Sequence, residues 1–262
     1  MDITSLASQA KKASIEFAIK STEEKNNALK EIAIALKEHE EEILKANAID
    51  IEESEKNNLE APLLKRLKFD KSKLKGVIEG IESLIALPDP VNETLTSTEL
   101  DTGLELYKVS CPIGVIGVIF ESRPDALVQI STLCLKSENG VLLKGGSEAL
   151  NTNRILTKVI HDASVKAGMP EGWIQLMETR ADVSEMLKLD DHIDLIIPRG
   201  SNDFVKYIMD NSNIPVLGHA DGICHGYVDK DADIDMALDL IVDSKCQYVA
   251  VCNALETLLV HK

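Results

Sequence analysis

Aromatic residues are scarce in this sequence: phenylalanine, tyrosine and tryptophan together make up 3% of its 262 residues. Proteins that bind single-stranded nucleic acid regardless of sequence stack the bases on aromatic side chains, so this class is disfavoured. Positive charge is also in short supply, and the formal net charge of -16 repels DNA, RNA and anionic membrane surfaces. We therefore expect no nucleic-acid partner and no membrane partner. Any site for an anionic small molecule needs local positive charge or the N-terminus of a helix.

Long apolar runs and paired cysteines are missing as well. The N-terminal segment has no apolar core ahead of a cleavage site, and no run approaches the length of a membrane span. The five cysteines are widely spaced and odd in number, which does not indicate a disulfide framework. No C-x-x-C pair occurs, and His219 and His225 flank Cys224 without completing a ligand set, so we expect no metal. These absences favour a protein of the reducing cytoplasm.

The N-terminal third of the chain is predicted to be helical. Ser21 and Glu24 have the spacing of a capping box. Behind them, apolar side chains recur at helical spacing on one face: Leu29, Ile32, Leu36 and Ile43. A further helix is predicted over residues 71–87. Turn residues at 101–103 then predict a hairpin over about residues 95–111.

Beyond the hairpin, short apolar runs alternate with amphipathic segments. The runs predict buried strands at residues 115–120, 141–143, 174–177, 193–197 and 215–217. The segments between and after them predict helices that begin at Pro124, cover 151–167, 181–189 and 203–209, and follow a cap at Asp231. Such alternation is typical of a parallel sheet covered by helices on both faces. These sheets bind ligands outside the carboxyl ends of their strands.

Two predicted strand-to-helix turns carry residues that suit a phosphate group. The first holds Lys144, Gly145, Gly146 and Ser147, whose glycines let backbone N–H groups approach an anion while the lysine adds charge. The second holds Gly200 and Ser201, with Ser201 as the N-cap of the next helix. From the residues alone, the alternative for the first segment is an ordinary turn with a surface lysine, and for the second a plain strand-to-helix turn, and both alternatives stay open.

The cysteines differ in their surroundings. Cys134 lies between leucines in a predicted helix and is expected in the core, and Cys111 precedes a proline at the start of a strand, which indicates a structural role. Cys224 and Cys246 fit either a structural or a chemical role. Cys252 lies between a polar segment and an apolar run, but an isolated cysteine is more often structural than nucleophilic.

Four segments, in the order of the chain, resemble the γ-glutamyl phosphate reductases, also called glutamate-5-semialdehyde dehydrogenases. They are residues 112–125 (PIGVIGVIFESRPD), 143–149 (LKGGSEA), 214–225 (IPVLGHADGICH) and 251–261 (VCNALETLLVH). This family belongs to the aldehyde dehydrogenase superfamily, which pairs a dinucleotide-binding domain with a catalytic domain and an oligomerising hairpin arm. The resemblance implies an aldehyde-dehydrogenase-like α/β fold. The dinucleotide-binding domain would cover residues 1–245, with the arm at about 95–111, and residues 246–262 would start a catalytic domain whose remainder is absent.

The resemblance also implies a reaction. Cys252 would be the catalytic thiol that attacks L-glutamate 5-phosphate, expels phosphate and forms a thioester. NADPH would then deliver hydride and release L-glutamate 5-semialdehyde, a step of proline biosynthesis. The backbone N–H of Cys252 and the side chains of Ser122 or Asn253 are candidate oxyanion donors. Arg123 is a candidate for a substrate carboxylate or phosphate, and a surface ion pair explains it equally well.

The same resemblance assigns the cofactor to the two turns, at residues 144–147 and at Gly200 and Ser201. Lys144 and Ser147 near the ribose are compatible with NADPH, but they do not separate NADPH from NADH. Aldehyde-oxidising relatives activate water with a glutamate in the segment that matches residues 217–222. Here His219 or Ala220 falls near that place, with Asp221 beside them, which suits a reductase that keeps water from its thioester.

Two other interpretations remain open. One is a non-catalytic dinucleotide-binding fragment, and the other is an acyl-reducing member of the superfamily with a different acyl substrate. The sequence ends ten residues after Cys252, and an apolar strand over residues 258–260 would have no neighbouring strand. We therefore expect a piece of a longer enzyme, inactive by itself and homo-oligomeric at full length.

Overall fold

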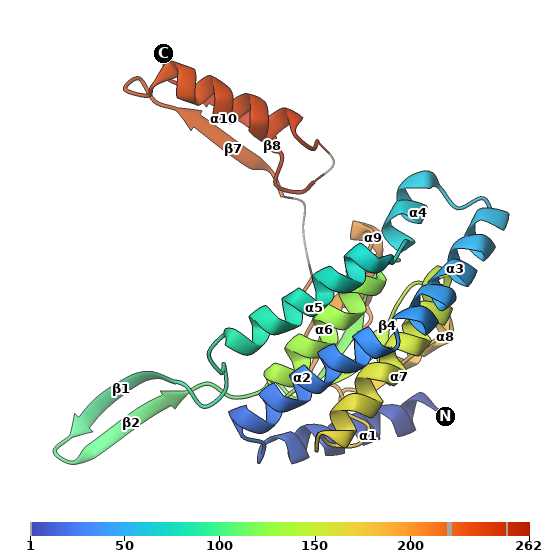
Figure 1. Cartoon of the computed structure of the whole chain (residues 1–262). Coiled ribbons are helices and arrows are strands. Elements are labelled where there is room, and N and C mark those ends of the chain that lie inside the picture. The colour runs from blue at the N-terminus through green and yellow to red at the C-terminus, as the bar shows by residue number, and fades with distance from the viewer. Residues whose placement is uncertain (1, 219–221, 250) are drawn as a thin grey trace. The chain divides into compact units, whose positions relative to one another are not determined.

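A computed structural model describes residues 2–218, 222–249 and 251–262 (Figure 1). The contacts within the chain define two compact units, Met1–Gly218 and His219–Lys262. This packing boundary lies before the boundary predicted at residues 245 and 246. The predicted boundary divides the chain by role, with cofactor binding before it and catalysis after it. The division by contacts does not test such roles, so the predicted boundary stays a prediction. Within the described residues, no helix is both long enough and apolar enough to cross a membrane.

The N-terminal third is helical, as predicted. Its helices are α1 (Ile3–Phe17), α2 (Thr22–Glu38), α3 (Glu40–Lys56), α4 (Ala61–Leu67) and α5 (Lys71–Ala86). The capping box starts α2: the backbone N–H of Glu24 donates to Ser21 Oγ at 3.2 Å, and the N–H of Ser21 donates to the Glu24 carboxylate at 2.8 Å. The predicted apolar face is fully buried, although Ile43 lies beyond a break at His39, in α3.

The first unit contains a parallel sheet with the strand order β5-β4-β3-β6. Its strands are β3 (Val115–Ile119), β4 (Gly140–Lys144), β5 (Ile174–Leu176) and β6 (Leu195–Pro198). The connecting helices are α6 (Pro124–Lys136), the short η1 (Ser147–Ala149), α7 (Leu150–Lys166), α8 (Arg180–Met186) and α9 (Asn202–Asp210). The strand predicted at residues 215–217 is reduced to one bridge between Ile196 and Val216.

Helices cover both faces of this sheet, which confirms the predicted fold class (Figure 1). Every residue of β3 and β4 is buried. Ile116 and Val118 face the cluster formed with α2, α6 and α7. Val115 and Ile119, at alternate positions, face the cluster formed with α1, α8 and α9. The continuous apolar runs of the sequence therefore reflect strands that are buried on both sides.

A polar contact fixes α1 at the amino edge of the sheet. Lys11 Nζ donates to both carboxylate oxygens of Asp194 at 2.7 Å, and Asp194 Oδ2 also accepts the N–H of Val115 at 2.8 Å. Gly114 has a φ of +121°, and a Cβ there would lie 2.2 Å from Asp194 Oδ2. Only glycine suits this position, because a side chain would be strained and would displace the carboxylate.

The predicted hairpin is present as β1 (Thr94–Asp101) and β2 (Leu104–Val109), which pair antiparallel around Gly103. All of its strand residues are exposed, and Figure 1 shows it extending from the helices and sheet of the first unit. Buried charges hold its base: Lys25 Nζ, with its side chain 1% exposed, lies 2.7 Å from Asp89 and 2.6 Å from Glu138. The root of the hairpin is thereby tied to α2 and to the turn that follows α6.

The second unit consists of β7 (Cys224–Val228), α10 (Ile234–Cys246) and β8 (Leu255–Val260). The prediction that the last strand has no neighbour is wrong, because β8 pairs in parallel with β7. The predicted cap at Asp231 is also wrong. The N–H of Asp231 donates to Asp229 Oδ1 at 3.2 Å within a turn, so the helix starts later, where Asp233 Oδ1 accepts the N–H of Met236 at 2.9 Å. No described residue of α10 is buried.

Candidate functional site

Three groups of predicted site residues follow strands of the same parallel sheet. Ser122 and Arg123 follow β3, residues 144–147 follow or end β4, and Gly200 and Ser201 follow β6. Because the strands are parallel, their carboxyl ends meet at one edge, and all three groups lie there. The chain order also reverses here, since β4 and β6 lie on opposite sides of β3. Open α/β sheets bind ligands at such a reversal, so the topology supports the predicted location.

The turn after β4 holds a buried ammonium group. Lys144 is 7% exposed, and its Nζ donates to the carbonyl of Gly145 at 2.6 Å. Within the part of the chain that the structure describes, no acceptor receives the backbone N–H of Gly145, Gly146 or Ser147. A lysine beside N–H groups of this kind fits a phosphate or the hydroxyls of a ribose.

The two glycines of this turn are required by packing within the protein. A Cβ at Gly145 would lie 2.3 Å from Asn153 Nδ2, and a Cβ at Gly146 would lie 2.1 Å from Glu148 Oε1. The space that the glycines leave is therefore filled by side chains of the protein. Close approach of a ligand is not needed to explain either residue, and cofactor binding by them stays a prediction.

Ser122 is buried and contacts a carboxylate that the sequence did not single out. Its hydroxyl donates to Glu148 Oε1, and Ser147 Oγ lies 3.4 Å from the other carboxylate oxygen. A serine has one O–H to donate, and here that donor is directed at Glu148. Donation from Ser122 to an oxyanion would require the hydroxyl to rotate. Glu148 directly follows Ser147. Its position next to the predicted phosphate turn was the only feature of the sequence that pointed to a role for Glu148 in the site.

Arg123 is exposed beside Ser122. In the described residues its side chain has no hydrogen bond or ion pair, whereas the neighbouring Glu121 accepts from Arg66 at 3.0 Å. The alternative explanation for Arg123 was a surface ion pair. The neighbouring carboxylate of Glu121 is paired with Arg66, so it does not provide that partner. The guanidinium remains available to an anionic ligand.

Asp50 of α3 caps the N-terminus of α7. This residue was not identified from the sequence. Its carboxylate is 2% exposed and accepts the backbone N–H of Asn151 at 3.0 Å and of Thr152 at 2.7 Å. It also accepts from the side chains of both residues. The residue in the N-cap position, Ala149, makes no side-chain cap. The N–H groups of Asn151 and Thr152 are therefore satisfied within the protein and are not offered to a ligand.

The turn after β6 is capped locally. Ser201 Oγ accepts the N–H of Phe204 at 3.3 Å, which confirms Ser201 as the N-cap of α9. Gly200 leaves room for the following aromatic ring, since a Cβ there would lie 2.9 Å from Phe204 Cδ1. The start of α9 thus has a neutral cap, unlike the start of α7.

Cys252 and Asn253 are exposed in the second unit, in the turn that precedes β8. The N–H of Ala254 donates to the carbonyl of Val251 at 3.1 Å and closes this turn. Cys224 Sγ donates to the carbonyl of Cys252 at 3.5 Å. The structure groups the predicted thiol with residues of its own unit. His219, Ala220 and Asp221, considered for the place of the water-activating glutamate, lie outside the described residues.

The remaining cysteines lie in different settings. Burial raises the pKa of the Cys134 thiol to about 12, which confirms its place in the core and makes it inert. Cys111 is exposed after the hairpin, and Cys246 is exposed at the end of α10. The described residues contain no group of three or more side chains that could hold a metal ion.

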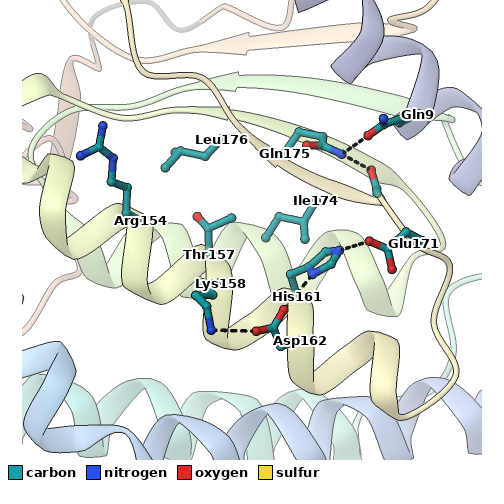
Figure 2. Close-up of a pocket in the computed structure, with 11 residues that line it drawn as sticks. Gln9, Arg154, Thr157, Lys158, His161, Asp162, Glu171, Ile174, Gln175 and Leu176 are labelled. Carbon is teal, nitrogen blue, oxygen red and sulfur yellow. Dashed lines mark hydrogen bonds and ion pairs between the residues drawn. The ribbon is translucent and has the colours of Figure 1, made fainter. Parts of the chain in front are cut away.

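A hollow of about 340 Å³ lies beside α7 and the edge strand β5, and several of its charged side chains are paired (Figure 2). Thr157 Oγ1, which also lines it, has no hydrogen-bond partner in the described residues. His161 Nε2 lies 3.3 Å from the Glu171 carboxylate, and Lys158 lies 3.0 Å from Asp162. Arg154 makes a double hydrogen bond to Glu178, and this bond lowers the pKa of Glu178. Paired groups of this kind indicate a charged surface rather than a second site.

Comparison with known proteins supports the resemblance drawn from the motifs. Residues 1–262 match the aldehyde dehydrogenase family. Gamma-glutamyl phosphate reductase of Acetivibrio thermocellus is 67% identical over 262 residues, which are 100% of this chain and 61% of that protein. The protein of the same name from Pelotomaculum thermopropionicum is 70% identical over 262 residues, again 100% of this chain and 60% of that protein.

A solved structure gives the same result for the fold. The crystal structure of gamma-glutamyl phosphate reductase from Thermotoga maritima superimposes with a TM-score of 0.94 at 37% identity, and the match covers 100% of this chain and 64% of that one. The corresponding structure from Saccharomyces cerevisiae has a TM-score of 0.78 at 42% identity, with coverage of 100% and 66%. The chain thus spans about three fifths of the length of the curated relatives it matches.

Proposed function

The chain belongs to the aldehyde dehydrogenase family, and from this we propose that it carries the dinucleotide-binding part and the catalytic thiol of a γ-glutamyl phosphate reductase. The observation that carries the proposal is the identity of 67% to 70%, over all 262 residues, to curated proteins of that name. The reaction is the NADPH-dependent reduction of L-glutamate 5-phosphate to L-glutamate 5-semialdehyde and phosphate, in proline biosynthesis. We place the enzyme in the cytoplasm, as a homo-oligomer.

Cys252 performs the covalent step. Its sulfur attacks the acyl carbon of the substrate, a C–S bond forms, the bond to phosphate breaks, and a thioester remains on the enzyme. A nicotinamide dinucleotide, when bound, supplies the hydride that reduces this acyl group. The thiol is regenerated as the aldehyde leaves. The exposed position of Cys252 in a turn suits a nucleophile that must reach a substrate.

The carboxyl edge of the sheet holds the residues that would bind the cofactor. Lys144 and the N–H groups of residues 145–147 would bind phosphate or ribose oxygens, and Gly200 and Ser201 would serve the pyrophosphate at the start of α9. Ser147 Oγ lies 3.4 Å from the Glu148 carboxylate, so the choice of NADPH in this proposal rests on the family resemblance and on the charge of Lys144. The positive charge of Lys144 is needed here, because the net charge of the chain is -16.

The substrate meets a separate set of groups. Arg123 binds a carboxylate or the phosphate of L-glutamate 5-phosphate, since its guanidinium is exposed and has no partner in the described residues. The backbone N–H of Cys252 and the amide of Asn253 donate to the developing oxyanion. Ser122 is a further candidate donor, and its hydroxyl must first turn away from Glu148.

The reverse reaction tests this function. The natural full-length protein is supplied with L-glutamate 5-semialdehyde, phosphate and NADP, and the formation of NADPH is followed by absorbance. We expect phosphate-dependent activity that falls by at least about 10³-fold in Cys252→Ala. The matched control is Cys246→Ala, which removes another exposed thiol and should retain activity.

Either of two outcomes would contradict the proposal. Activity retained in Cys252→Ala would move the nucleophile to another residue. A folded wild-type protein without activity on this substrate would exclude the reaction, and other acyl phosphates and acyl thioesters would then test for a different acyl-reducing member of the family.

A further inference from the structure

Cys224 and Cys252 are in contact within the second unit. Cys224 Sγ lies 3.5 Å from the carbonyl oxygen of Cys252, and a Cβ built at Gly222 would lie 3.1 Å from the same oxygen. The contact follows from strand pairing, since the register of β7 and β8 sets Cys224 opposite Leu255, which closely follows Cys252. All of these residues belong to one compact unit.

This contact brings the thiol of Cys224 close to Cys252. A carbonyl oxygen lies roughly 2.4 Å from its own Cα, so Cys224 Sγ is no more than about 6 Å from the Cα of Cys252. A disulfide between them requires Cα atoms about 4.4 to 6.8 Å apart and the side chain of Cys252 turned toward Cys224. Cys252 lies in a turn and outside β8, so rotation of its side chain and a small shift of the turn are not opposed by strand hydrogen bonds.

Exposure distinguishes the two thiols. Cys252 is exposed, whereas Cys224 is partly buried at the start of β7. An oxidant in solution therefore reaches Cys252 first, and Cys224 is held beside it. Oxidation-sensitive cysteines are often placed next to a second cysteine that resolves the first oxidation product.

We propose that this pair is a modification site whose substrate is hydrogen peroxide. The sulfur of Cys252 attacks the peroxide, an S–O bond forms, the O–O bond breaks, and sulfenic acid and water result. The sulfur of Cys224 then attacks the sulfenic sulfur, the S–S bond forms, the S–O bond breaks, and a second water leaves. Two thiols lose two electrons in total, and hydrogen peroxide is reduced to two waters.

The disulfide has two consequences for Cys252. It blocks the thiol and so stops any reaction in which Cys252 is the nucleophile, a consequence that rests on the proposed function. It also protects the sulfur from further oxidation to sulfinic acid, which is not reversed by thiol reductants. A dithiol restores both cysteines, so the pair converts a permanent loss into a reversible one.

Mass spectrometry tests the linkage directly. The natural full-length protein is treated with hydrogen peroxide, the remaining thiols are alkylated, and the digest is searched for a peptide that joins residues 224 and 252. We expect this link to be the main product, together with the loss of two alkylatable thiols. Dithiothreitol should reverse both changes. This readout needs no enzymatic activity, so it succeeds or fails independently of the proposed function.

Two variants sharpen the test. In Cys224→Ser, peroxide should convert Cys252 to sulfinic acid, and the fraction of activity recovered with dithiothreitol should fall at least about fivefold relative to wild type. Cys246→Ser, the matched control at the end of α10, should behave as wild type. A main product that links residues 246 and 252, or sulfinic acid at Cys252 in the wild type, would overturn the proposal.

Discussion

Two strand-to-helix turns of the same sheet, after β4 and after β6, have similar sequences and different structures. Both place glycine and serine at the carboxyl end of a buried strand. The helix after the first turn, α7, receives its cap from Asp50, a buried carboxylate on α3. The helix after the second, α9, receives its cap from Ser201 in the turn itself. The first turn therefore depends on a distant part of the chain, and the second is built locally.

The difference determines what each turn has to offer a phosphate. At α7 the positive end of the helix is already matched by the charge of Asp50, so an anion there must be bound by Lys144 and the N–H groups before the helix. At α9 the cap is a neutral hydroxyl, and the helix dipole is not compensated by it. Two turns with similar sequences would thus bind an anion through different groups, and substitutions in each turn test the two separately.

The largest effect is expected at Asp50. In Asp50→Ala the buried N–H groups of Asn151 and Thr152 lose their acceptor, which should lower the free energy of unfolding by about 3 kcal/mol. Urea unfolding measures this loss. Asp50→Asn is the matched control, because its amide oxygen still accepts, and it should lose about half as much. A change of less than about 0.5 kcal/mol in Asp50→Ala would mean that the carboxylate does not hold α7 in place.

A smaller effect is expected at Lys144, and it concerns ligand affinity. Lys144→Met removes the ammonium but keeps an unbranched side chain, so the Kd of NADPH should rise by about tenfold or more. The Kd of NADH should rise less if the lysine meets the additional phosphate. Calorimetric titration of the full-length protein measures both constants. Lys158→Met, in the hollow beside β5, is the control, and equal weakening by the two variants would exclude a specific role for Lys144.

Ser201 should contribute about 1 kcal/mol to stability, the usual value of a helix N-cap. Thermal unfolding of Ser201→Ala measures it. Ser201→Asp keeps a good cap, and its negative charge should weaken NADPH binding while stability is retained. If Ser201→Asp binds NADPH as tightly as wild type does, the cofactor does not approach the start of α9.

The smallest effect concerns a third turn, after β5, where Glu178 is bound by Arg154 of α7. This hydrogen bond lowers the pKa of Glu178 below its ordinary value of 4.5. A lowered pKa in the folded state gives stability that is present above the unfolded pKa and is lost as the pH falls through the folded one. Because both groups are partly exposed, we expect Glu178→Gln to cost about 0.5 kcal/mol at pH 7. The cost should shrink as the pH falls below 4.5 and through the lowered pKa of the folded state, and a cost that persists once Glu178 is protonated would exclude the ion pair as its source.

Local patterns in the sequence predicted most of the framework. Capping residues such as Ser21 and Ser201 act on residues three positions away, so their role is visible in the sequence. The apolar runs of β3 and β4 were recognised because a strand buried on both faces leaves no polar position. Resemblance added the family, which is confirmed over residues 1–262.

The contacts that shape the candidate site were not predictable in this way. Asp50 acts on residues 101 and 102 positions away, and Glu148 meets Ser122 across two strands. Strand β7 was missed because its sequence, CHGYV, has no apolar periodicity, and it forms by pairing with β8. In each case the partner is fixed by the tertiary fold, so a pattern within one segment does not reveal it.

The ion pair between Lys11 and Asp194 has a consequence for how the chain folds during synthesis. The two residues are 183 positions apart, and α1 buries Ala7 and Ala10 against the sheet face that this contact fixes. At the usual pace of translation, roughly 10 s or more separate the emergence of the helix from that of its partner. During that time β3, β4 and β5, which also contact α1, emerge, so α1 docks first on an incomplete sheet. A chain that ends before residue 194 therefore lacks the ion pair that fixes α1 at the amino edge of the sheet.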